Sequence, residues 1–447
     1  MRATRAIVHL DIFRENLKLI RDWLAAESGA TGDGAARPGA AYHRGGGRQS
    51  AAGTPKICLA VKADAYGHGI GPIARVAIDE GVEYLAVAAV DEAVALREEG
   101  ISAPLLLYSL PIREEIRAIL DYGVTPLVSD VDFVADLSEA AELRSQRTGE
   151  PAEPLAVHLK IDTGMGRIGC RPEDAAELAR TIEAAPRLQL EGVSTHFPNA
   201  DDPDQTFTNA QIERFIGAVD SIRAAGIDPG LIHAANSAGL LEHPGSRLDM
   251  VRPGLLAYGY YSTDTQERHL PVRPVMELES RIVYLKSVPP GTPISYGSTY
   301  RTRERTWIAT IPVGYGDGYS RLLSNNGDVL VEESATGRRV RAPIAGRVCM
   351  DQLMLDLGPD TRARRYDRVV LFGPDPTGPD AAELARRTQT IPYEITCNIS
   401  KRVPRVYREP STVGARAAAT EERPRSETTE PGPGYRVVSG RPTVPRD

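Results

Sequence analysis

A lysine stands at the end of an apolar run in the segment AVKADAYGHG, residues 60–69. Lysine side chains are usually solvated at protein surfaces, so Lys62 at the mouth of a strand that belongs to the core needs a chemical explanation. An amine that loses its hydration has a lowered pKa, and its neutral form can attack a carbonyl group to form a Schiff base. The segment therefore predicts a nucleophilic lysine, with Tyr66 in the turn that follows it.

Polar side chains follow later apolar runs in the same way. They are Lys160, Arg167, His196, Asn236, Ser237 and Arg252, and Gly254 at the end of the last run offers its backbone. We find no pair of carboxylates suited to glycoside hydrolysis, no Gly-x-Ser-x-Gly motif and no cluster of metal ligands, so we predict no metal site. A Schiff-base lysine, a hydroxyl and backbone amides suited to a phosphate, and an arginine across the rim describe a site for pyridoxal 5'-phosphate (PLP).

Eight apolar runs, separated by stretches with helical patterning, must position these side chains. They cover residues 56–61, 83–90, 104–109, 123–129, 154–161, 188–196, 230–236 and 248–254. Strands that alternate with helices form parallel sheets, and eight such units are typical of a closed (β/α)8 TIM barrel. An open, doubly wound sheet is the alternative. The number of runs, and the lack of a phosphate-binding glycine motif in the early units, favour the barrel.

The rest of the chain divides by composition. Residues 1–12 predict a strand that packs on the C-terminal domain, residues 13–255 the barrel, and residues 256–408 a β-rich domain. Residues 28–53 are rich in Gly and Ala and predict a flexible insertion. Residues 409–447 predict a disordered tail.

The composition limits the function classes. The chain has 447 residues, 41% of them hydrophobic, and a formal net charge of −7, which argues against a nucleic-acid partner. Its four cysteines are scattered without a Cys-x-x-Cys pair, which is typical of a reducing compartment. No signal peptide or membrane-spanning run stands out. We therefore expect a cytoplasmic protein with no membrane partner.

A set of ordered motifs identifies a family. The chain resembles alanine racemases, PLP enzymes of fold type III, from about residue 5 to residue 407, on the segments AVKADAYGHG, HLKIDTGMGRIG, STHF, NSAG, MVRPGLLAYG, SYGSTY, IPVGYGDGY, CMD and RVPR. The resemblance implies interconversion of L- and D-alanine, which supplies D-alanine for peptidoglycan. GMGRIG also fits the dinucleotide motif Gly-x-Gly-x-x-Gly, but it follows the fifth predicted strand and its helix begins only after Pro172.

The resemblance implies two catalytic bases. Lys62 would hold PLP as a Schiff base and serve one face of the substrate α-carbon, and Tyr296 would serve the other face. A tyrosine has a pKa of about 10, so its phenolate needs nearby donors, for which His196 and Arg252 are the candidates. Arg252 would face the pyridine nitrogen and oppose its protonation. Related decarboxylases place a carboxylate there, so Arg252 favours a racemase.

The remaining roles also follow from the resemblance. Tyr66, Ser237, Gly254 and the Leu255 N–H would bind the phosphate, Arg167 and Met350 would bind the substrate, and Tyr315 and Asp351 would narrow the entrance. Lys160 would carry a carbamate that holds Arg167; a direct salt bridge from Lys160 to Asp162 is an equal alternative. In the family, one subunit's C-terminal domain completes the other's pocket, so Tyr296 and Met350 would act within a head-to-tail homodimer.

One position departs from the family and two other functions stay open. Lys401 stands just before RVPR, where we expect a tyrosine that contacts the phosphate. A racemase of broader specificity, for serine or larger amino acids, is the nearest enzymatic alternative. A non-catalytic PLP carrier is the alternative of another class, but it would lack the β-rich domain.

Overall fold

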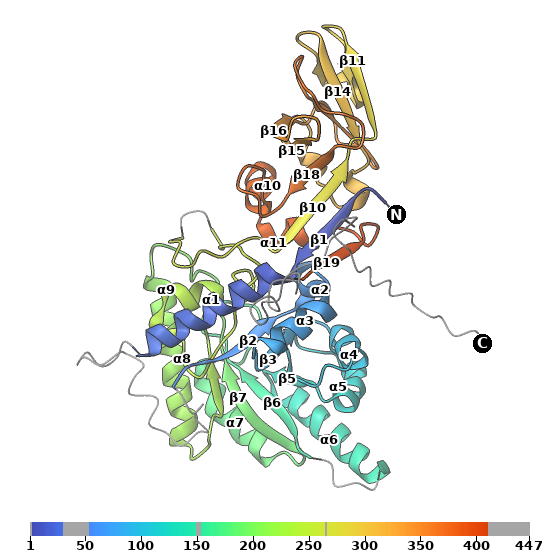
Figure 1. Cartoon of the computed structure of the whole chain (residues 1–447). Helices are drawn as coiled ribbons and strands as arrows, with labels where there is room; N and C mark the ends of the chain where they lie inside the picture. The colour runs from blue at the N-terminus through green and yellow to red at the C-terminus, as the bar shows by residue number, and fades with distance from the viewer. Residues whose placement is uncertain (1, 30–52, 149–152, 264–265, 410–447) are drawn as a thin grey trace, which may run out of the picture.

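The computed structural model describes residues 2–29, 53–148, 153–263 and 266–409 (Figure 1). Most of the predicted insertion and the predicted tail lie outside these residues. Residues 28 and 29, which the prediction assigned to the insertion, belong instead to the end of helix α1 (Leu10–Gly29).

Eight parallel strands close into a barrel, as the sequence predicts, so the open-sheet alternative is wrong. The last strand pairs with the first, Lys56 opposite Met250 and Ile57 opposite Val251. The strands are β2 (Lys56–Ala60), β3 (Tyr84–Val87), β4 (Leu105–Leu107), β5 (Thr125–Val128), β6 (Leu155–Lys160), β7 (Leu188–Ser194), β8 (Leu231–His233) and β9 (Met250–Val251).

Helices surround the barrel and bury one apolar face each. In α3, for example, Ile73, Ala74, Val76 and Ala77 are buried, at the spacing that one side of a helix requires. The helices after α1 are α2 (Lys62–Tyr66), α3 (Ile70–Asp79), α4 (Val90–Glu98), α5 (Ile116–Tyr122), α6 (Val131–Thr148), α7 (Ala175–Ala184), α8 (Thr206–Ala224) and α9 (Ser237–Glu242), with 3₁₀ turns η3 (Arg113–Glu115), η4 (Pro172–Asp174) and η5 (Pro244–Ser246).

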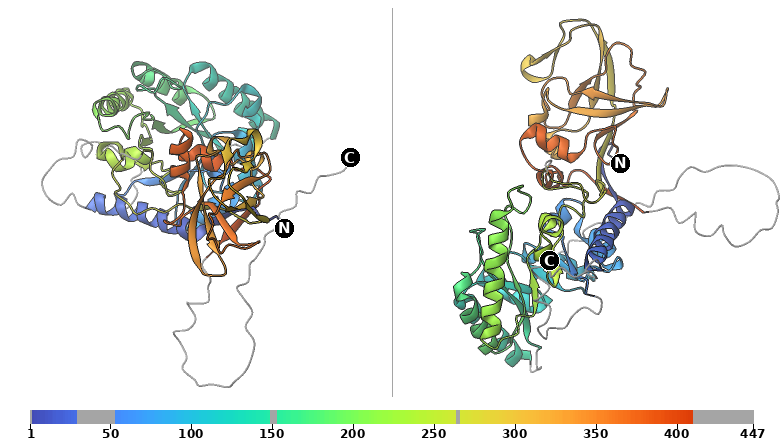
Figure 2. Two further views of the ribbon diagram at one scale, coloured as in Figure 1. Left: turned by 90° about the horizontal axis from the view of Figure 1, so that it is seen from above. Right: turned by 90° about the vertical axis from the view of Figure 1, so that its left-hand side faces the viewer.

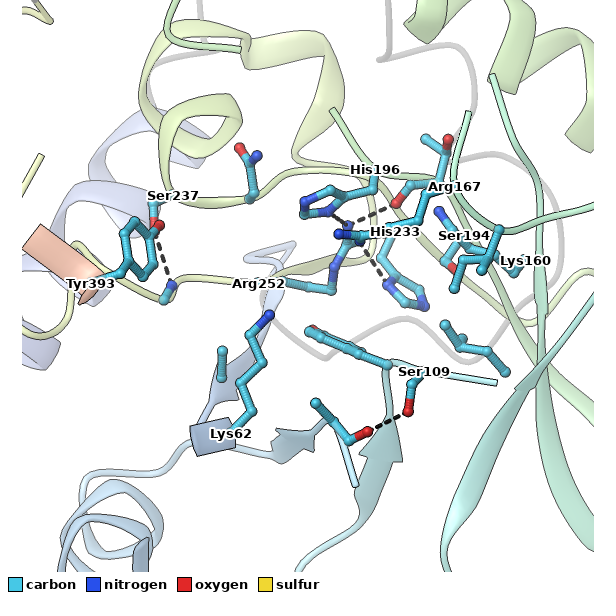
Figure 3. Close-up of a pocket in the computed structure, with 18 of the residues that line it drawn as sticks. Lys62, Ser109, Lys160, Arg167, Ser194, His196, His233, Ser237, Arg252 and Tyr393 are labelled. Carbon is cyan, nitrogen blue, oxygen red and sulfur yellow. Dashed lines mark hydrogen bonds between the residues drawn. The ribbon is translucent and has the colours of Figure 1, made fainter. Parts of the chain in front are cut away.

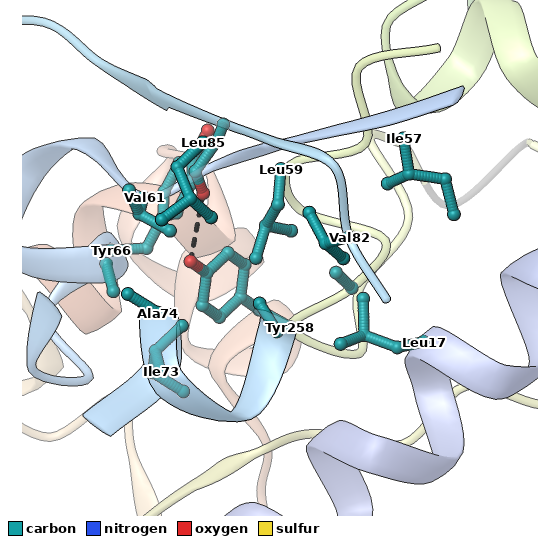
Figure 4. Close-up of a cluster of buried hydrophobic side chains, with 14 of the residues drawn as sticks. Leu17, Ile57, Leu59, Val61, Tyr66, Ile73, Ala74, Val82, Leu85 and Tyr258 are labelled. Atoms are coloured by element: carbon teal, nitrogen blue, oxygen red, sulfur yellow. Dashed lines mark hydrogen bonds between the residues drawn. The ribbon is translucent and has the colours of Figure 1, made fainter. Parts of the chain in front are cut away.

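The core beside β2 fixes the strand end that precedes Lys62. Leu59, Val61 and Leu85 pack there against the Tyr258 ring (Figure 4). The buried Tyr258 hydroxyl donates to the Ala60 carbonyl at 2.9 Å, so its polar atom is satisfied inside an apolar cluster. None of the described helices combines the length and apolar character that crossing a membrane requires.

The C-terminal domain stands at one end of the barrel (Figure 2) and is built on a six-stranded sheet in the order β16-β15-β18-β10-β1-β19. Its elements are β10 (Met276–Arg281), β11 (Tyr284–Val288), β12 (Pro293–Ile294), η6 (Tyr296–Ser298), β13 (Tyr300–Arg301), β14 (Thr306–Ile311), η7 (Tyr315–Asp317), η8 (Arg321–Leu323), β15 (Asp328–Glu333), β16 (Arg338–Pro343), β17 (Leu353–Asp356), β18 (Arg368–Phe372), α10 (Ala381–Thr388), α11 (Pro392–Cys397) and β19 (Arg405–Arg408).

The N-terminal strand β1 (Arg5–His9) belongs to this sheet, although α1, which follows it, covers the barrel (Figure 1). It pairs antiparallel with β10 and parallel with β19. The two ends of the folded chain therefore lie side by side, and β1 ties the barrel to the second domain.

Buried ion pairs join the strands of this sheet. Arg368 contacts Glu277 at 2.5 Å, Glu279 at 2.7 Å and Glu332 at 2.8 Å, and Arg5 pairs with Glu279. Burial raises the pKa of Glu277 more than Arg368 lowers it. Burial also opposes the charged form of Glu279, but the hydrogen bonds and charges of Arg368 and Arg5 outweigh it and lower its pKa.

We predict that Arg368→Ala lowers the free energy of unfolding by about 3–5 kcal/mol, because it leaves buried carboxylates without their cation. Urea unfolding followed by tryptophan fluorescence measures the change. Arg339→Ala is the matched control, since Arg339 is more exposed and its pairs with Glu332 and Asp375 should contribute less than about 1 kcal/mol. Equal effects of the two substitutions would contradict the prediction.

Candidate active site

A cavity of about 720 Å³ opens at the carboxyl ends of the barrel strands (Figure 3). Loops at this end of a TIM barrel carry the active site in characterised enzymes. The cavity brings together nine residues that the sequence singles out: Lys62, Tyr66, Lys160, Arg167, His196, Asn236, Ser237, Arg252 and Gly254.

A left-handed turn sets the direction of the Lys62 side chain. Ala63, Asp64, Ala65 and Tyr66 all have φ values of 53–55°. Residues other than glycine avoid this region, at a cost of roughly 1–2 kcal/mol each. Such a turn persists only where its surroundings hold it.

Hydrogen bonds from three directions hold the turn. The Glu92 carboxylate accepts from the Ala63 N–H at 2.5 Å, and His68 Nδ1 lies 2.9 Å from the Ala65 carbonyl and 3.0 Å from that of Tyr66. Burial lowers the pKa of His68 to about 4, so the ring is neutral and donates through Nδ1. From the C-terminal domain, Arg405 Nε donates to the Gly67 carbonyl at 3.0 Å.

Close packing explains the glycine that ends the turn. A Cβ on Gly67 would lie 2.3 Å from the Thr396 carbonyl oxygen of α11, and Gly67 itself has a φ of 83°. The close contact with the C-terminal domain therefore requires a glycine at position 67 of YGHG. Lys62 projects from this fixed turn into the cavity (Figure 3). Burial, together with the charge of Arg167, lowers the pKa of its amine and favours the neutral nucleophile.

Arg252 is buried at the centre of the cavity. Its Nη1 donates to His233 Nδ1 at 2.9 Å, and its Nη2 donates to the carbonyls of Thr195 and Ala234 and to His196 Nδ1 at 3.2 Å. In the described part of the chain no carboxylate forms an ion pair with it. Burial and the Arg252 charge hold the pKa of His196 well below its usual value, so His196 is neutral and carries its proton on Nε2.

Lys160 is fully buried beside this arginine, and burial and the Arg252 charge lower the pKa of its amine strongly. The alternative of a direct salt bridge to Asp162 is wrong for this structure. The Asp162 carboxylate instead accepts backbone N–H groups of Gly164, Met165 and Gly166 at 2.9–3.1 Å and so shapes the loop that carries Arg167.

A cradle for a phosphate lies at the opposite wall. The Ser237 hydroxyl accepts the Gly254 N–H at 2.9 Å, and Leu255 follows with its side chain buried in the core, which leaves its backbone for this role. A Cβ on Gly254 would lie 2.7 Å from the Tyr66 hydroxyl. The space in front of these groups therefore stays open only because residue 254 has no side chain.

The sequence analysis missed a tyrosine of this cradle. Tyr393 on α11 lines the cavity, with its ring centroid 5.2 Å from that of Tyr66 (Figure 3). Lys401, which stands where we expected a tyrosine, is exposed and does not line the cavity. Tyr393, eight positions earlier, therefore offers the cavity a tyrosine hydroxyl that Lys401 does not. The cavity wall also includes Tyr108, Ser194 and His233, which periodicity alone did not single out.

The other predicted residues lie on the C-terminal domain, outside the cavity wall. Tyr296, Met350 and Tyr315 are exposed, by 72%, 52% and 43%. Backbone hydrogen bonds hold this surface together: the Tyr315 N–H donates to Cys349 and the Gly316 N–H to Met350. Asp351 accepts from Arg402 at 2.7 Å on the same surface. We call Tyr296, Tyr315, Met350 and Asp351 the exposed patch.

Comparisons with known proteins agree over most of the chain. The family model "Alanine racemase, N-terminal domain" matches residues 47–262, and "Alanine racemase, C-terminal domain" matches residues 275–407. An alanine racemase of Treponema denticola is 42% identical and covers 91% of this chain and 98% of its own length. One of Halothermothrix orenii is 41% identical and covers 79% of this chain and 90% of its own length.

Solved structures show the same arrangement. An alanine racemase of Clostridium difficile superposes with a TM-score of 0.78 at 34% identity, over 91% of this chain and 96% of its own. An alanine racemase of Bacillus anthracis with bound L-Ala-P gives a TM-score of 0.77 at 32% identity, over 92% and 96% of the two chains.

We predict that Gly254→Ala weakens PLP binding by about tenfold or more, because the new methyl group fills the cradle and leaves polar groups without their partners. Equilibrium dialysis with absorbance detection measures the dissociation constant. Gly245→Ala is the matched control, since a Cβ on Gly245 meets nothing within 4 Å. Equal PLP affinities of the two variants would place the phosphate elsewhere.

Proposed function

The chain belongs to the alanine racemase family, and we propose that its barrel cavity and the exposed patch of a second subunit together interconvert L- and D-alanine with PLP. The observation that carries the proposal is the division of the predicted groups. Lys62, Arg252, His196 and the phosphate cradle share one cavity, whereas Tyr296 stands exposed on the other domain.

The cavity fits PLP in both chemistry and shape. When bound in this cavity, PLP would supply the electron-withdrawing group that makes the α-proton of an amino acid removable. Tyr66, Tyr393, Ser237 and the backbone of Gly254 and Leu255 would hold the phosphate, with Lys62 as the amine. Arg252 would face the pyridine nitrogen, and its permanent charge would oppose protonation there, which limits side reactions such as transamination.

Racemisation requires a base on each face of the α-carbon. Lys62 would exchange the proton on one face, and Tyr296 of the partner subunit on the other. His196 supports this role, because its Nδ1 accepts from Arg252 and its Nε2–H remains to stabilise a phenolate oxygen. Arg167 and Met350 would bind the substrate, and Tyr315 and Asp351 would narrow its path. A carbamate on Lys160 would offer Arg167 an anion that Asp162 does not supply.

A head-to-tail homodimer follows from this arrangement, since each cavity would take Tyr296 and Met350 from the other subunit. The carrier alternative is not favoured, because the C-terminal family domain is present over residues 275–407. Nor is a serine-type specificity favoured, since the curated relatives compared here are named alanine racemases. A cytoplasmic location stays a prediction from the cysteine usage.

Tyr296→Phe should slow removal of the α-proton from L-alanine by about 10²–10⁴-fold and affect D-alanine far less, since only one face loses its base. L- and D-alanine are equally stable, so net racemisation slows equally in both directions and cannot separate the bases. Proton exchange in deuterated water, started from each enantiomer, measures the two faces separately. Equal losses of exchange would contradict the assignment of separate bases.

Mixed dimers test the shared site. A dimer of one Lys62→Ala subunit and one Tyr296→Phe subunit should have about half the wild-type activity, because one site then carries both lesions and the other carries none. Two affinity tags allow the mixed dimer to be purified after co-expression. The two parent homodimers are the controls, with a lesion in every site. A mixed dimer as inactive as its parents would place both bases in one subunit.

A further inference from the structure

Below Arg252, three side chains that the proposed mechanism does not use form a chain through the barrel interior. His233 on β8 accepts from Arg252, and its Nε2 lies 2.8 Å from Nδ1 of His158 on β6. His158 Nε2 lies 3.1 Å from the Glu191 carboxylate on β7. Both histidines are buried, at 1% and 0% exposure, so this chain lies inside the packed barrel.

The strand geometry makes room for this chain. The pairing of β6 with β7 shifts between Val157 and His158, so that Glu191 is the additional residue of a β-bulge. Bulges redirect side chains and are frequent beside active sites. The next residue is Gly192, whose Cβ would lie 2.8–2.9 Å from the His158 ring. A regular strand with a side chain at position 192 would exclude the imidazole.

The hydrogen bonds from Arg252 to Glu191 all donate in the same direction, and Arg252 determines that direction. A guanidinium group only donates, so His233 Nδ1 must accept and the proton of His233 lies on Nε2. That proton can bond only to His158 Nδ1, and the proton of His158 then lies on Nε2 and bonds to Glu191. Burial opposes the charged form of Glu191, but hydrogen bonds from His158 and Tyr84, together with nearby positive charge, outweigh it and lower the pKa of the carboxyl.

This direction excludes two other interpretations. A positively charged His158 would donate from Nδ1 and force the proton of His233 onto Nδ1, where it would meet the Arg252 N–H. A proton wire would have to pass through Arg252, which does not release its proton in proteins. These hydrogen-bonded side chains therefore orient Arg252 and do not conduct protons.

We propose that His158 and Glu191 are positioning residues for Arg252, which hold His233 in the tautomer that accepts from the guanidinium and so fix its orientation. Without them, Arg252 alone favours this tautomer of His233, so the imidazole and its bond to Arg252 are held less firmly. The inference rests on the proposed role of Arg252 at PLP. Neither test below involves proton transfer to the substrate, so its failure is separate from failure of the two-base assignment.

The first test is ¹⁵N NMR of the histidine side chains in the full-length enzyme, with PLP bound and after its removal. We expect His158 and His233 each to carry one proton, on Nε2, as the donor directions along the hydrogen-bonded chain require. In Arg252→Ala, which removes the donor that fixes the end of the hydrogen-bonded chain, both tautomers of His233 should appear. A charged His158 in the wild type, or a proton on its Nδ1, would overturn the proposal.

The second test is the PLP dissociation constant. His158→Leu should raise it by about tenfold, since it leaves a buried donor unsatisfied, and His158→Gln should restore most of the affinity because glutamine both donates and accepts. His243→Leu is the control: His243 is also buried and bonds to the Ala200 carbonyl, away from the chain. PLP binding by His158→Leu as tight as in this control would overturn the proposal.

A second variant covers the case in which His158→Leu does not fold. Glu191→Met removes the acceptor at the half-buried end of the chain, where a side chain of similar size is tolerated more easily. It should weaken PLP binding at least a few-fold and allow both histidine tautomers in the NMR spectrum. A wild-type spectrum with wild-type affinity would overturn the proposal equally.

Discussion

Arginine donates hydrogen bonds and accepts none, and this constraint at Arg252 orders the centre of the molecule. Because the guanidinium meets no carboxylate among the described residues, lone pairs from four groups must hold it, two of them on histidines. Each histidine that accepts there has its proton on the far nitrogen. The His196 proton faces the cavity, and the His233 proton bonds to His158. The buried charge of Arg252 thus places the His196 proton that could stabilise a phenolate, and it also sets the proton positions of His233 and His158.

The lysine depends on a second constraint, which joins the two domains. A left-handed turn of four residues is costly, and its bonds come from α4, from His68 and from Arg405 of the sheet domain. The Thr396 backbone packs against Gly67, and the N-terminal strand β1 pairs with β19. The sheet domain is therefore more than a carrier of the exposed patch. It supports the turn that aims Lys62 in its own subunit, while in the proposed dimer its exposed patch would face the cavity of the other subunit.

The sequence could predict which side chains lie at the ends of the barrel strands. It could not predict which side chains of the C-terminal domain reach the same cavity. Periodic apolar runs locate strand ends, and parallel strands bring those ends to one rim, which is why Lys62, His196 and Arg252 could be grouped. Tyr393 reaches the same rim through α11, a helix of the other domain, and no spacing rule links it to the barrel. The turn after Lys62 contradicts local preference, since residues other than glycine rarely have a positive φ. Asp162 was available to Lys160 in sequence but is used by backbone N–H groups in the structure.

Burial is unequal on the two sides of the proposed reaction, and this difference would explain a need for two subunits. The groups of the barrel cavity have pKa values shifted by burial, as those of Lys62 and His196 show. Tyr296 is 72% exposed, so in a lone chain water would solvate its hydroxyl. Placed over another subunit's cavity, the same side chain would lose water and gain the His196 N–H and the Arg252 charge. Association would then create the second base and also close the open face of the cavity, so assembly and activation of Tyr296 would be one physical event.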